Sequence, residues 1–290
     1  MSEPRVAMLV SRVRVEEKLL LEAFARRGVT VEMVDVRDLV LDTTAAAPRW
    51  DVVLDRSLQQ SHALAALRLL GDRGIPTVNT HQVVASCSDK VVTTSLLAAA
   101  GVPVPRTAVA FSVEGALRAI ESIGYPAVLK PPVGSWGRLL ARVNDRDAAE
   151  ALLDHKATLG SVAHSVFYIQ EHIDKPGRDI RAFVVGDDVV CAVDRHSAHW
   201  VTNTARGATT ANRPVTSALR DVCLAAARAV GGGVLAVDLL EDGERLLVSE
   251  VNHTMEFRNS VDVTGVDIAA HIVAHTLAAA RRGAREAVLA

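Results

Sequence analysis

Short apolar runs alternate with segments of helical periodicity over the first eighty residues. Val6-Ala-Met-Leu-Val10 has the length of a buried strand, and residues 15–27 carry apolar side chains at helical spacing up to Gly28. The same reasoning predicts further strands over 29–36, 51–54 and 75–78, with a helix over 63–70. Strands that alternate with helices in this way predict a parallel sheet with helices on its faces.

The pattern changes after the connector that contains Pro103 and Pro105. A helix over 90–100 precedes the connector, and beyond it we expect strands over 107–111, 127–130 and 139–143 with helices over 113–123 and 148–159. The last part predicts strands over 167–172, 179–185, 189–195, 233–240 and 245–251, and helices over 217–230 and 268–281. We therefore predict an α/β protein with domains at 1–85, 86–165 and 166–290.

Composition excludes several classes of function. The 290 residues are 49% apolar and carry 32 Lys and Arg against 34 Asp and Glu, a net charge of −2. This balance and an aromatic content of 3% argue against nucleic-acid binding, and no apolar run approaches the ~20 residues of a membrane span. The three cysteines lack metal-ligand spacing, which indicates a reduced, cytoplasmic protein. No Gly-x-Gly-x-x-Gly follows the first strand, so a dinucleotide site is not predicted.

Three oxygen-bearing side chains near the end of the chain are candidate metal ligands. Glu250 and Asn252 lie two residues apart on a predicted strand and so share a face, and Asp238 lies in the preceding strand. An oxygen-only set of this kind suits Mg²⁺ together with nucleotide phosphates. The alternative is a strand end with Asn in the following turn.

Two lysines are candidate phosphate ligands. Lys130 ends an apolar strand just before a turn that contains Gly134 and Gly137, and Lys90 begins a predicted helix. An ammonium group beside exposed backbone N–H groups suits phosphate oxygens. Solvated lysines beside an ordinary loop are the alternative.

The remaining charged residues of interest lie on the strands of the last unit and in the loop after them. Asp179 and Arg181 share one strand face, and Arg195 and Arg206 add further cations near a polar turn. A cross-strand ion pair would also explain the first two. Together with the lysines, the arginines predict an anion-attracting cleft in a chain that is acidic overall.

The order of these residues resembles that of the ATP-grasp carboxylate–amine ligases. The similarity is greatest to the RimK-like branch, and within it to the LysX type that acts on an amino-group carrier protein. It extends from about residue 5 to 277 and is strongest in segments 134–140, 175–181, 197–207 and 250–257. The chain departs from the pattern at Asp194, His196 and Ala208, which bears on the substrate more than on the reaction.

The resemblance implies an ATP-grasp fold and a role for each motif. The fold would comprise a Rossmann-like pre-ATP-grasp domain, a small α+β subdomain with a phosphate lid, and a C-terminal α+β subdomain with the metal site. ATP would be bound by Lys90, Lys130, Ser135, Trp136, Gly137, Gln170, Glu171, His172, Ile173, Asp179, Thr202 and Asn203, with Arg138 also in the lid. Asp238, Glu250 and Asn252 would hold two Mg²⁺ ions, with Mn²⁺ as an alternative metal. Arg181, Arg195 and Arg206 would act on the reacting groups, and His253, Glu256 and Phe257 would recognise the amino substrate.

The implied function is a ligase of amino-acid biosynthesis, of the lysine or arginine type or in specialised metabolism. It would convert the C-terminal glutamate side chain of a small acidic, LysW-like carrier into an acyl phosphate. It would then couple this group to the α-amino group of 2-aminoadipate or glutamate. The resemblance also implies a homodimer or homotetramer. The alternatives are a ligase that adds glutamate to another protein's C-terminus, and a non-catalytic nucleotide-binding regulator.

Overall fold

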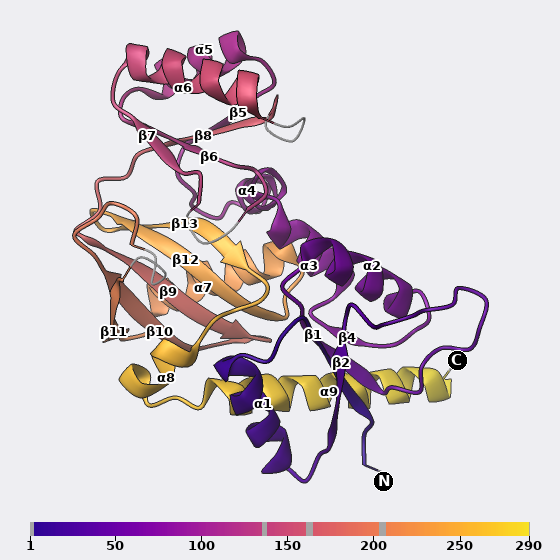
Figure 1. Cartoon of the computed structure of the whole chain (residues 1–290). Helices are drawn as coiled ribbons and strands as arrows, with labels where there is room; N and C mark the ends of the chain where they lie inside the picture. The colour runs from indigo at the N-terminus through magenta and orange to yellow at the C-terminus, as the bar shows by residue number, and fades with distance from the viewer. Residues whose placement is uncertain (1–2, 135–137, 161–164, 203–206, 290) are drawn as a thin grey trace.

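The computed structural model describes residues 3–134, 138–160, 165–202 and 207–289, with the backbone alone for 284–289. Three sheets, each accompanied by helices, form three lobes around a common centre (Figure 1).

The first lobe is a parallel sheet with the order β2-β1-β3-β4. Its strands are β1 (Val6–Val10), β2 (Val31–Asp35), β3 (Val52–Arg56) and β4 (Thr77–Val78), and its helices are α1 (Val15–Ala25) and α2 (Gln60–Gly71). Every side chain of β1 is buried, as expected for a central strand with both faces covered. The predicted parallel sheet is confirmed.

The second lobe is a four-stranded antiparallel sheet that lies at the top of Figure 1. Its strands are β5 (Thr107–Ala110), β6 (Ala127–Lys130), β7 (Ala141–Val143) and β8 (Phe167–Glu171), in the order β5-β8-β6-β7. Helices α5 (Val113–Ile123) and α6 (Arg146–Leu159) pack side by side over the sheet. Ala116 and Ile120, one turn apart on α5, face the core of this lobe, which is formed by residues 110–169 alone among the described residues.

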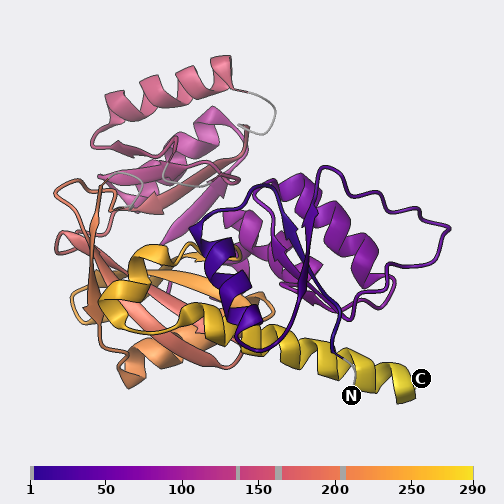
Figure 2. The ribbon, with the colours of Figure 1, turned by 60° about the horizontal axis from the view of Figure 1, so that its bottom comes forward.

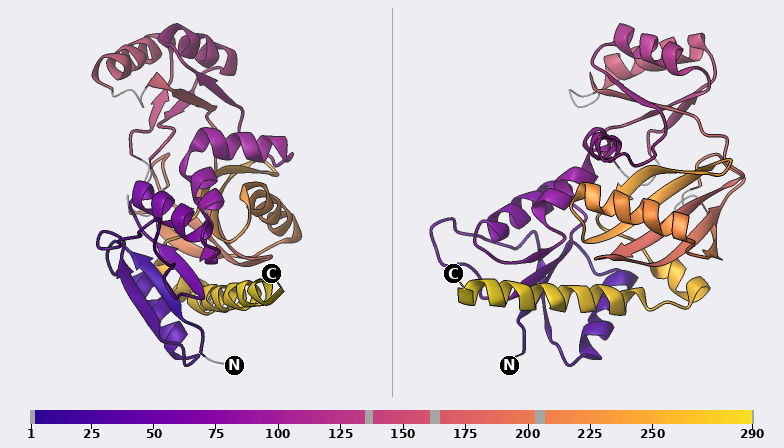
Figure 3. Two further views of the ribbon diagram at one scale, coloured as in Figure 1. Left: turned by 90° about the vertical axis from the view of Figure 1, so that its right-hand side faces the viewer. Right: turned by 180° about the vertical axis from the view of Figure 1, so that it is seen from behind.

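The third lobe is a five-stranded antiparallel sheet with the order β11-β10-β9-β12-β13. Its strands are β9 (Arg178–Val185), β10 (Asp188–His196), β11 (Thr209–Arg213), β12 (Val234–Asp242) and β13 (Arg245–Asn252). Helix α7 (Ser217–Val230) covers one face, as the view from behind shows (Figure 3). Thr216 caps the start of α7 by accepting a hydrogen bond from the Leu219 N–H, and Gly231 ends it in the left-handed conformation.

The last helix, α9 (Ile268–Leu289), lies against the first sheet rather than beside its neighbours in sequence (Figure 2). Its residues Ile268, Ile272 and Val273 share one apolar core with Met8 of β1 and Phe183 of β9. The first and third lobes are therefore joined by a continuous core.

No single helix among the described residues is both long and apolar enough to cross a membrane. Residues 258–264 and 268–283, which meet at a bend of 114°, reach that length and apolarity only as a pair.

Three short elements were not predicted from the sequence: α3 (His81–Ser88), α8 (Arg258–Thr264) and strand β11. Helix α4 (Lys90–Ala99) was predicted, and Asp89 caps it by accepting a hydrogen bond from the Val91 N–H. The strand expected over 139–143 is shorter, and Leu139 before it has a positive φ of 57°.

Candidate functional site

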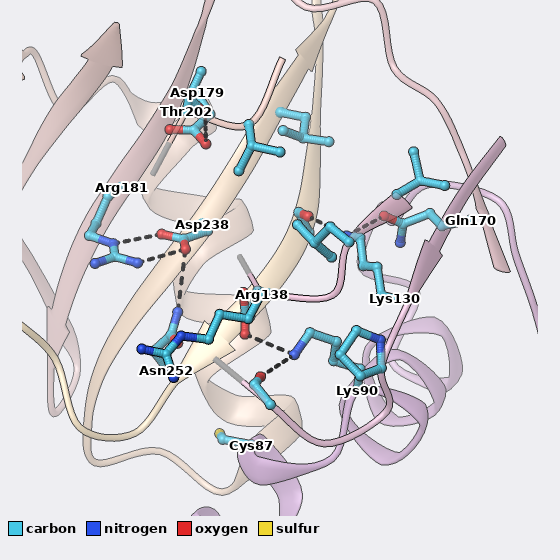
Figure 4. A pocket seen from close by; sticks show the side chains of 18 of the residues that line it. Cys87, Lys90, Lys130, Arg138, Gln170, Asp179, Arg181, Thr202, Asp238 and Asn252 are labelled. Carbon is cyan, nitrogen blue, oxygen red and sulfur yellow. Dashed lines mark hydrogen bonds and ion pairs between the residues drawn. The ribbon is translucent and has the colours of Figure 1, made fainter. Parts of the chain in front are cut away.

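A cavity of about 420 Å³ lies where the three lobes meet. This volume is within the range of small-molecule sites. All but one of the predicted site residues that the structure describes line it: Lys90, Lys130, Gln170, Glu171, His172, Ile173, Asp179, Arg181, Arg195, Thr202, Asp238, Glu250, Asn252, His253 and Glu256. Figure 4 shows how several of these side chains point toward one another from different strands. Residues far apart in the sequence are therefore brought to one place.

Strand register explains the pairing of charges on the floor of the cavity. Arg195 of β10 is opposite Asp179 of β9, and its guanidinium donates to both carboxylate oxygens, at 2.7 and 2.9 Å. Arg181 of β9 is opposite Asp238 of β12, and its guanidinium makes the same bidentate contact with the two carboxylate oxygens, at 2.7 and 2.8 Å. Asp179 and Arg181 thus pair across strands with other residues and not with each other.

Asp238 stands at the centre of this charge network. Its Oδ2 also accepts a hydrogen bond from Asn252 Nδ2 at 3.3 Å and lies 3.4 Å from Arg195 Nη2. Burial alone would raise the pKa of Asp238, but the guanidiniums of Arg181 and Arg195 lower it to about 2. The carboxylate is therefore ionised throughout the physiological range.

The three candidate metal ligands are adjacent on the β12–β13 hairpin. Asp238 is directly opposite Glu250, and Asn252 follows two residues later on β13. Two carboxylates and an amide oxygen form a donor set that suits Mg²⁺ with nucleotide phosphates. The described residues contain no group of three or more His, Cys, Asp and Glu side chains arranged around one metal position. The site thus fits a metal that takes part of its ligands from the nucleotide or from water.

The two candidate phosphate lysines reach the cavity from different elements, Lys90 from α4 and Lys130 from β6. Lys90 Nζ donates to the Gly134 carbonyl oxygen at 2.7 Å and lies 3.3 Å from Glu250 Oε1. Lys130 Nζ donates to Gln170 Oε1 at 2.7 Å and to Ser249 Oγ at 3.2 Å. Burial lowers the pKa of Lys130 to about 8, since a charged group loses hydration there.

Lys175 is a third lysine of the cavity, and it was not among the site residues predicted from the sequence. Its Nζ donates to Thr202 Oγ1 at 2.6 Å and lies 3.6 Å from Asp179 Oδ2. Thr202 in turn donates to the Asp179 carboxylate. Lys175 lies four residues before Asp179, in a segment of the resemblance, but its charge alone did not distinguish it from a solvated lysine.

The segment 170–173 comprises the end of β8 and the two residues after it, and it lines the cavity on its second-lobe side. Gln170 is buried, and the Glu171 carboxylate accepts a hydrogen bond from the Arg106 backbone N–H at 2.6 Å. The His172 ring lies 6.2 Å from the Trp200 ring, and burial together with Arg142 lowers the pKa of His172. The segment thus combines a buried amide at Gln170, a carboxylate held by a backbone N–H and a pair of aromatic rings.

The segment 253–256 forms another wall of the cavity and is held by the first lobe. Asn79 Nδ2 donates to the His253 carbonyl oxygen at 2.8 Å, and Arg56 Nη2 donates to the Met255 carbonyl oxygen at 3.0 Å. Arg56 is buried against the equally buried Glu17, with its Nε 2.9 Å from Glu17 Oε1. The hydrogen-bond partners therefore fix the position of this wall relative to the first sheet.

His253 and Glu256 line the cavity, whereas Phe257 does not. Burial and the nearby Arg56 lower the pKa of His253 to about 4, so its ring is neutral at physiological pH. Glu256 is exposed and lies 3.5 Å from Arg14 Nη1. Phe257 is fully buried in the core shared by the first and third lobes, which corrects its expected role in substrate contact.

Five predicted site residues lie outside the described part of the structure: Ser135, Trp136, Gly137, Asn203 and Arg206. Their neighbours Gly134, Arg138 and Thr202 line the cavity.

Comparisons with known proteins agree with this geometry. Residues 6–86 match the LysX pre-ATP-grasp domain, and residues 87–276 match the RimK-like ATP-grasp domain. The chain is 32% identical to the glutamate–LysW ligase ArgX of Sulfolobus acidocaldarius over 93% of its own length and 97% of that protein. It is 34% identical to the α-aminoadipate–LysW ligase LysX of Saccharolobus solfataricus, over 88% of its length and 94% of that protein. The crystal structure of a RimK domain ATP-grasp protein from Sphaerobacter thermophilus superposes with a TM-score of 0.80 and 31% identity, covering 94% of this chain and 99% of the other.

Proposed function

Because this chain belongs to the RimK-like ATP-grasp ligases and is thus an ATP-dependent ligase, we propose that it couples an amino acid to a small acidic carrier protein. The bond would join the α-amino group of glutamate or 2-aminoadipate to the side-chain carboxylate of a glutamate that ends a LysW-like carrier. Support comes from one observation above all: the cavity combines an oxygen donor set with cations from all three lobes.

Most of the site residues would bind ATP and Mg²⁺, and the arginines would act on the reacting groups. Lys90 and Lys130 would bind the ATP phosphates, and the backbone and side chains of 170–173 would contact the adenine. Asp179, Thr202 and Asn203 would contact the sugar and phosphates, and the segment containing Ser135, Trp136, Gly137 and Arg138 would cover the triphosphate. ATP-grasp ligases use Mg²⁺. Here Asp238, Glu250 and Asn252 would bind two Mg²⁺ ions, and Mn²⁺ could replace them. Bound metal neutralises charge on the γ-phosphoryl oxygens.

The reaction needs two successive steps on one carboxyl group, the first at the γ-phosphorus of ATP and the second at the carboxyl carbon. The carrier carboxylate oxygen attacks the γ-phosphorus and ADP leaves, which gives an acyl phosphate. The neutral amine then attacks the carbonyl carbon, phosphate leaves with its bridging oxygen, and the amine proton passes to solvent. Arg181, Arg195 and Arg206 would orient the carboxylate and stabilise the negative charge that develops on its oxygen. Acid–base catalysis by His253 is not required, which fits its lowered pKa.

We also propose that the protein acts in the cytoplasm as a homodimer or homotetramer, with the domain boundaries given above. An acidic carrier tail suits the cavity because Lys and Arg outnumber Asp and Glu among its lining residues.

The test is ADP release measured with amino acid and carrier, each added alone and together. We expect release only with both, with glutamate or 2-aminoadipate as the amino acid. Release with glutamate and an unrelated protein's acidic tail would favour tail glutamylation. Nucleotide binding without release under every condition would favour a regulator.

A further inference from the structure

The buried Glu17 carboxylate, in the first turn of α1, holds two arginines of the first lobe. Arg14 donates to it from Nε at 3.0 Å and from Nη2 at 2.7 Å, and Arg56 donates from Nε at 2.9 Å. Burial alone would raise the pKa of Glu17, but the hydrogen bond from Arg14 and the charge of Arg56 lower it to about 2. Glu17 is therefore ionised at physiological pH and restrains both guanidinium groups.

Each arginine carries this restraint to the cavity between the lobes. Arg56 Nη2 donates to the Met255 carbonyl oxygen at 3.0 Å, in the wall that follows the candidate metal ligands. Arg14 lines the cavity itself, with its Nη1 3.5 Å from Glu256 Oε1 of the same wall. Glu17 does not line the cavity, so its effect on a bound molecule passes through the two arginines.

The first-lobe end of the cavity suits a ligand other than the nucleotide. None of the residues that we assign to ATP or Mg²⁺ comes from the first lobe, whereas Arg14, Ser57 and Gln60 of that lobe line the cavity. The Ser57 hydroxyl is buried and has no hydrogen-bond partner within the part of the chain that the structure describes. Buried hydroxyl groups in folded proteins are nearly always paired, so this one leaves a hydrogen bond for a bound molecule. This end of the cavity thus faces the reacting groups.

We infer that Glu17 is a positioning residue for the second step of the ligation, in which the amine displaces phosphate from the acyl phosphate. This inference rests on the proposed function and adds to it a residue outside the cavity. Glu17 holds Arg14 directly and holds the wall at Met255 through Arg56, and it thereby fixes the end of the cavity where the amine approaches the carbonyl carbon.

Without this restraint, water competes with the amine for the acyl phosphate. Attack by the amine gives the amide and free phosphate. When water attacks the carbonyl carbon instead, phosphate leaves with the bridging oxygen, the original carboxylate is restored, and a proton passes to solvent. ATP is then consumed and no amide forms. The ratio of amide formed to ADP released therefore reports the position of the amine, and a role in stability alone would not change it.

The experiment compares the wild-type protein with Glu17→Gln, Glu17→Asp and Arg14→Gln. Glu22→Gln is the control, because Glu22 is an exposed carboxylate on the same helix and does not line the cavity. ADP and amide are measured in the same samples with carrier and glutamate or 2-aminoadipate. A parallel series replaces the amino acid with hydroxylamine, a small nucleophile that traps the acyl phosphate as a hydroxamate. Thermal unfolding verifies that each variant is folded.

We expect the wild-type protein and Glu22→Gln to form equal amounts of amide and ADP. Glu17→Gln should lower the ratio of amide to ADP about threefold or more and the kcat/KM for the amino acid about tenfold or more, with the KM for ATP unchanged. Hydroxamate formation should stay near the wild-type rate, because this small nucleophile does not depend on the fixed wall. Glu17→Asp retains the charge and should recover part of the ratio. Arg14→Gln leaves Glu17 paired with Arg56 and should show part of the loss.

Wild-type ratios in both Glu17→Gln and Arg14→Gln would overturn this inference and leave the ligase function standing. An equal loss of amide and hydroxamate would also overturn it, because the substitution would then act on the first step. If Glu17→Gln does not fold, the ratio in Arg14→Gln decides alone. A wild-type protein that forms no amide with either amino acid would contradict the proposed function, and this inference with it.

Discussion

Lys130 carries an ammonium group whose charge state should control nucleotide affinity near neutral pH. Because its pKa is lowered to about 8, the wild-type side chain loses its charge as the pH rises from 7 to 9. We expect the Kd for ATP with Mg²⁺ to increase over this range. In Lys130→Arg the guanidinium stays charged, so this increase should be absent.

Replacing Lys130 by Met should weaken ATP binding by about tenfold or more at pH 7, the order expected for a lost charge-assisted contact. Lys156→Met is the control, because Lys156 lies on α6, packs on the Phe167 ring and does not line the cavity. Equal ATP affinity of the two Met variants, measured by calorimetry, would contradict the phosphate-binding role.

Glu250 is the second carboxylate of the candidate metal site, and its neutral isostere separates charge from shape. We expect Glu250→Gln to reduce turnover about 100-fold or more, since a metal ligand loses its charge while the fold is retained. Glu244→Gln, an exposed change in the same hairpin, should have no effect. Turnover and thermal unfolding are measured over a Mg²⁺ series. Normal turnover of Glu250→Gln at ordinary Mg²⁺ concentrations would contradict the assignment of Glu250 as a metal ligand.

At the scale of elements, the junction between β4 and β12 depends on close approach to Gly233. Asn79 accepts a hydrogen bond from the Val234 N–H at 2.7 Å and donates to the Val234 carbonyl oxygen at 2.8 Å. A Cβ at Gly233 would overlap with the Asn79 side chain, and Gly233 has a φ of +102°. Neighbouring Gly232 also has a positive φ, of +79°, but a Cβ there meets nothing within 4 Å.

We therefore expect Gly233→Ala to lower the free energy of unfolding by about 2 kcal/mol more than Gly232→Ala, because it loses buried hydrogen bonds in addition to backbone strain. Chemical denaturation measures both variants. Asn79→Ala combined with Gly233→Ala should show a smaller loss than the sum of the single changes. An equal loss in free energy of unfolding for the two glycine substitutions would show that the contact between residue 233 and Asn79 does not contribute to stability.

The elements with strong periodicity were predictable from the sequence, and the short ones were not. Helix α7 has buried residues at helical spacing and both of its end signals, and its predicted bounds agree with the structure. Helix α8 is seven residues long and polar at most positions, so its tertiary contacts decide its conformation. The parallel direction of the strands in the first sheet was predictable, because strands and helices alternate along this part of the chain.

The candidate site was predictable as a set of residues but not as a set of contacts. Local spacing indicated that Asp238, Glu250 and Asn252 belong together, because two neighbouring strands carry them. It did not show that Arg181 pairs with Asp238 and Arg195 with Asp179, since the order β10-β9-β12 depends on which strands become neighbours. The resemblance implies a substrate contact for both Glu256 and Phe257, and a sequence alone does not indicate that Phe257 faces the core.

At the scale of the whole molecule, a protein with a net negative charge has a cavity in which Lys and Arg outnumber Asp and Glu. Attraction between this cavity and an acidic carrier tail should accelerate association, and salt should screen it. We expect the association rate constant, measured by stopped flow, to fall about tenfold or more between low and high ionic strength. A carrier with Gln in place of its tail glutamates should show a much weaker dependence. A rate constant that does not respond to salt for either carrier would contradict electrostatic steering.

The shared core beneath α9 affects how the chain acquires its structure during synthesis. Met8 and Phe24 share their core with Ile272 and Val273, which come some 250 residues later in the chain. The first sheet therefore cannot bury its α9-facing side until α9 has been translated. The second lobe has a core of its own over residues 110–169 and is free to fold before then. Folding is thus expected to begin in the second lobe and to finish when α9 packs against the first sheet.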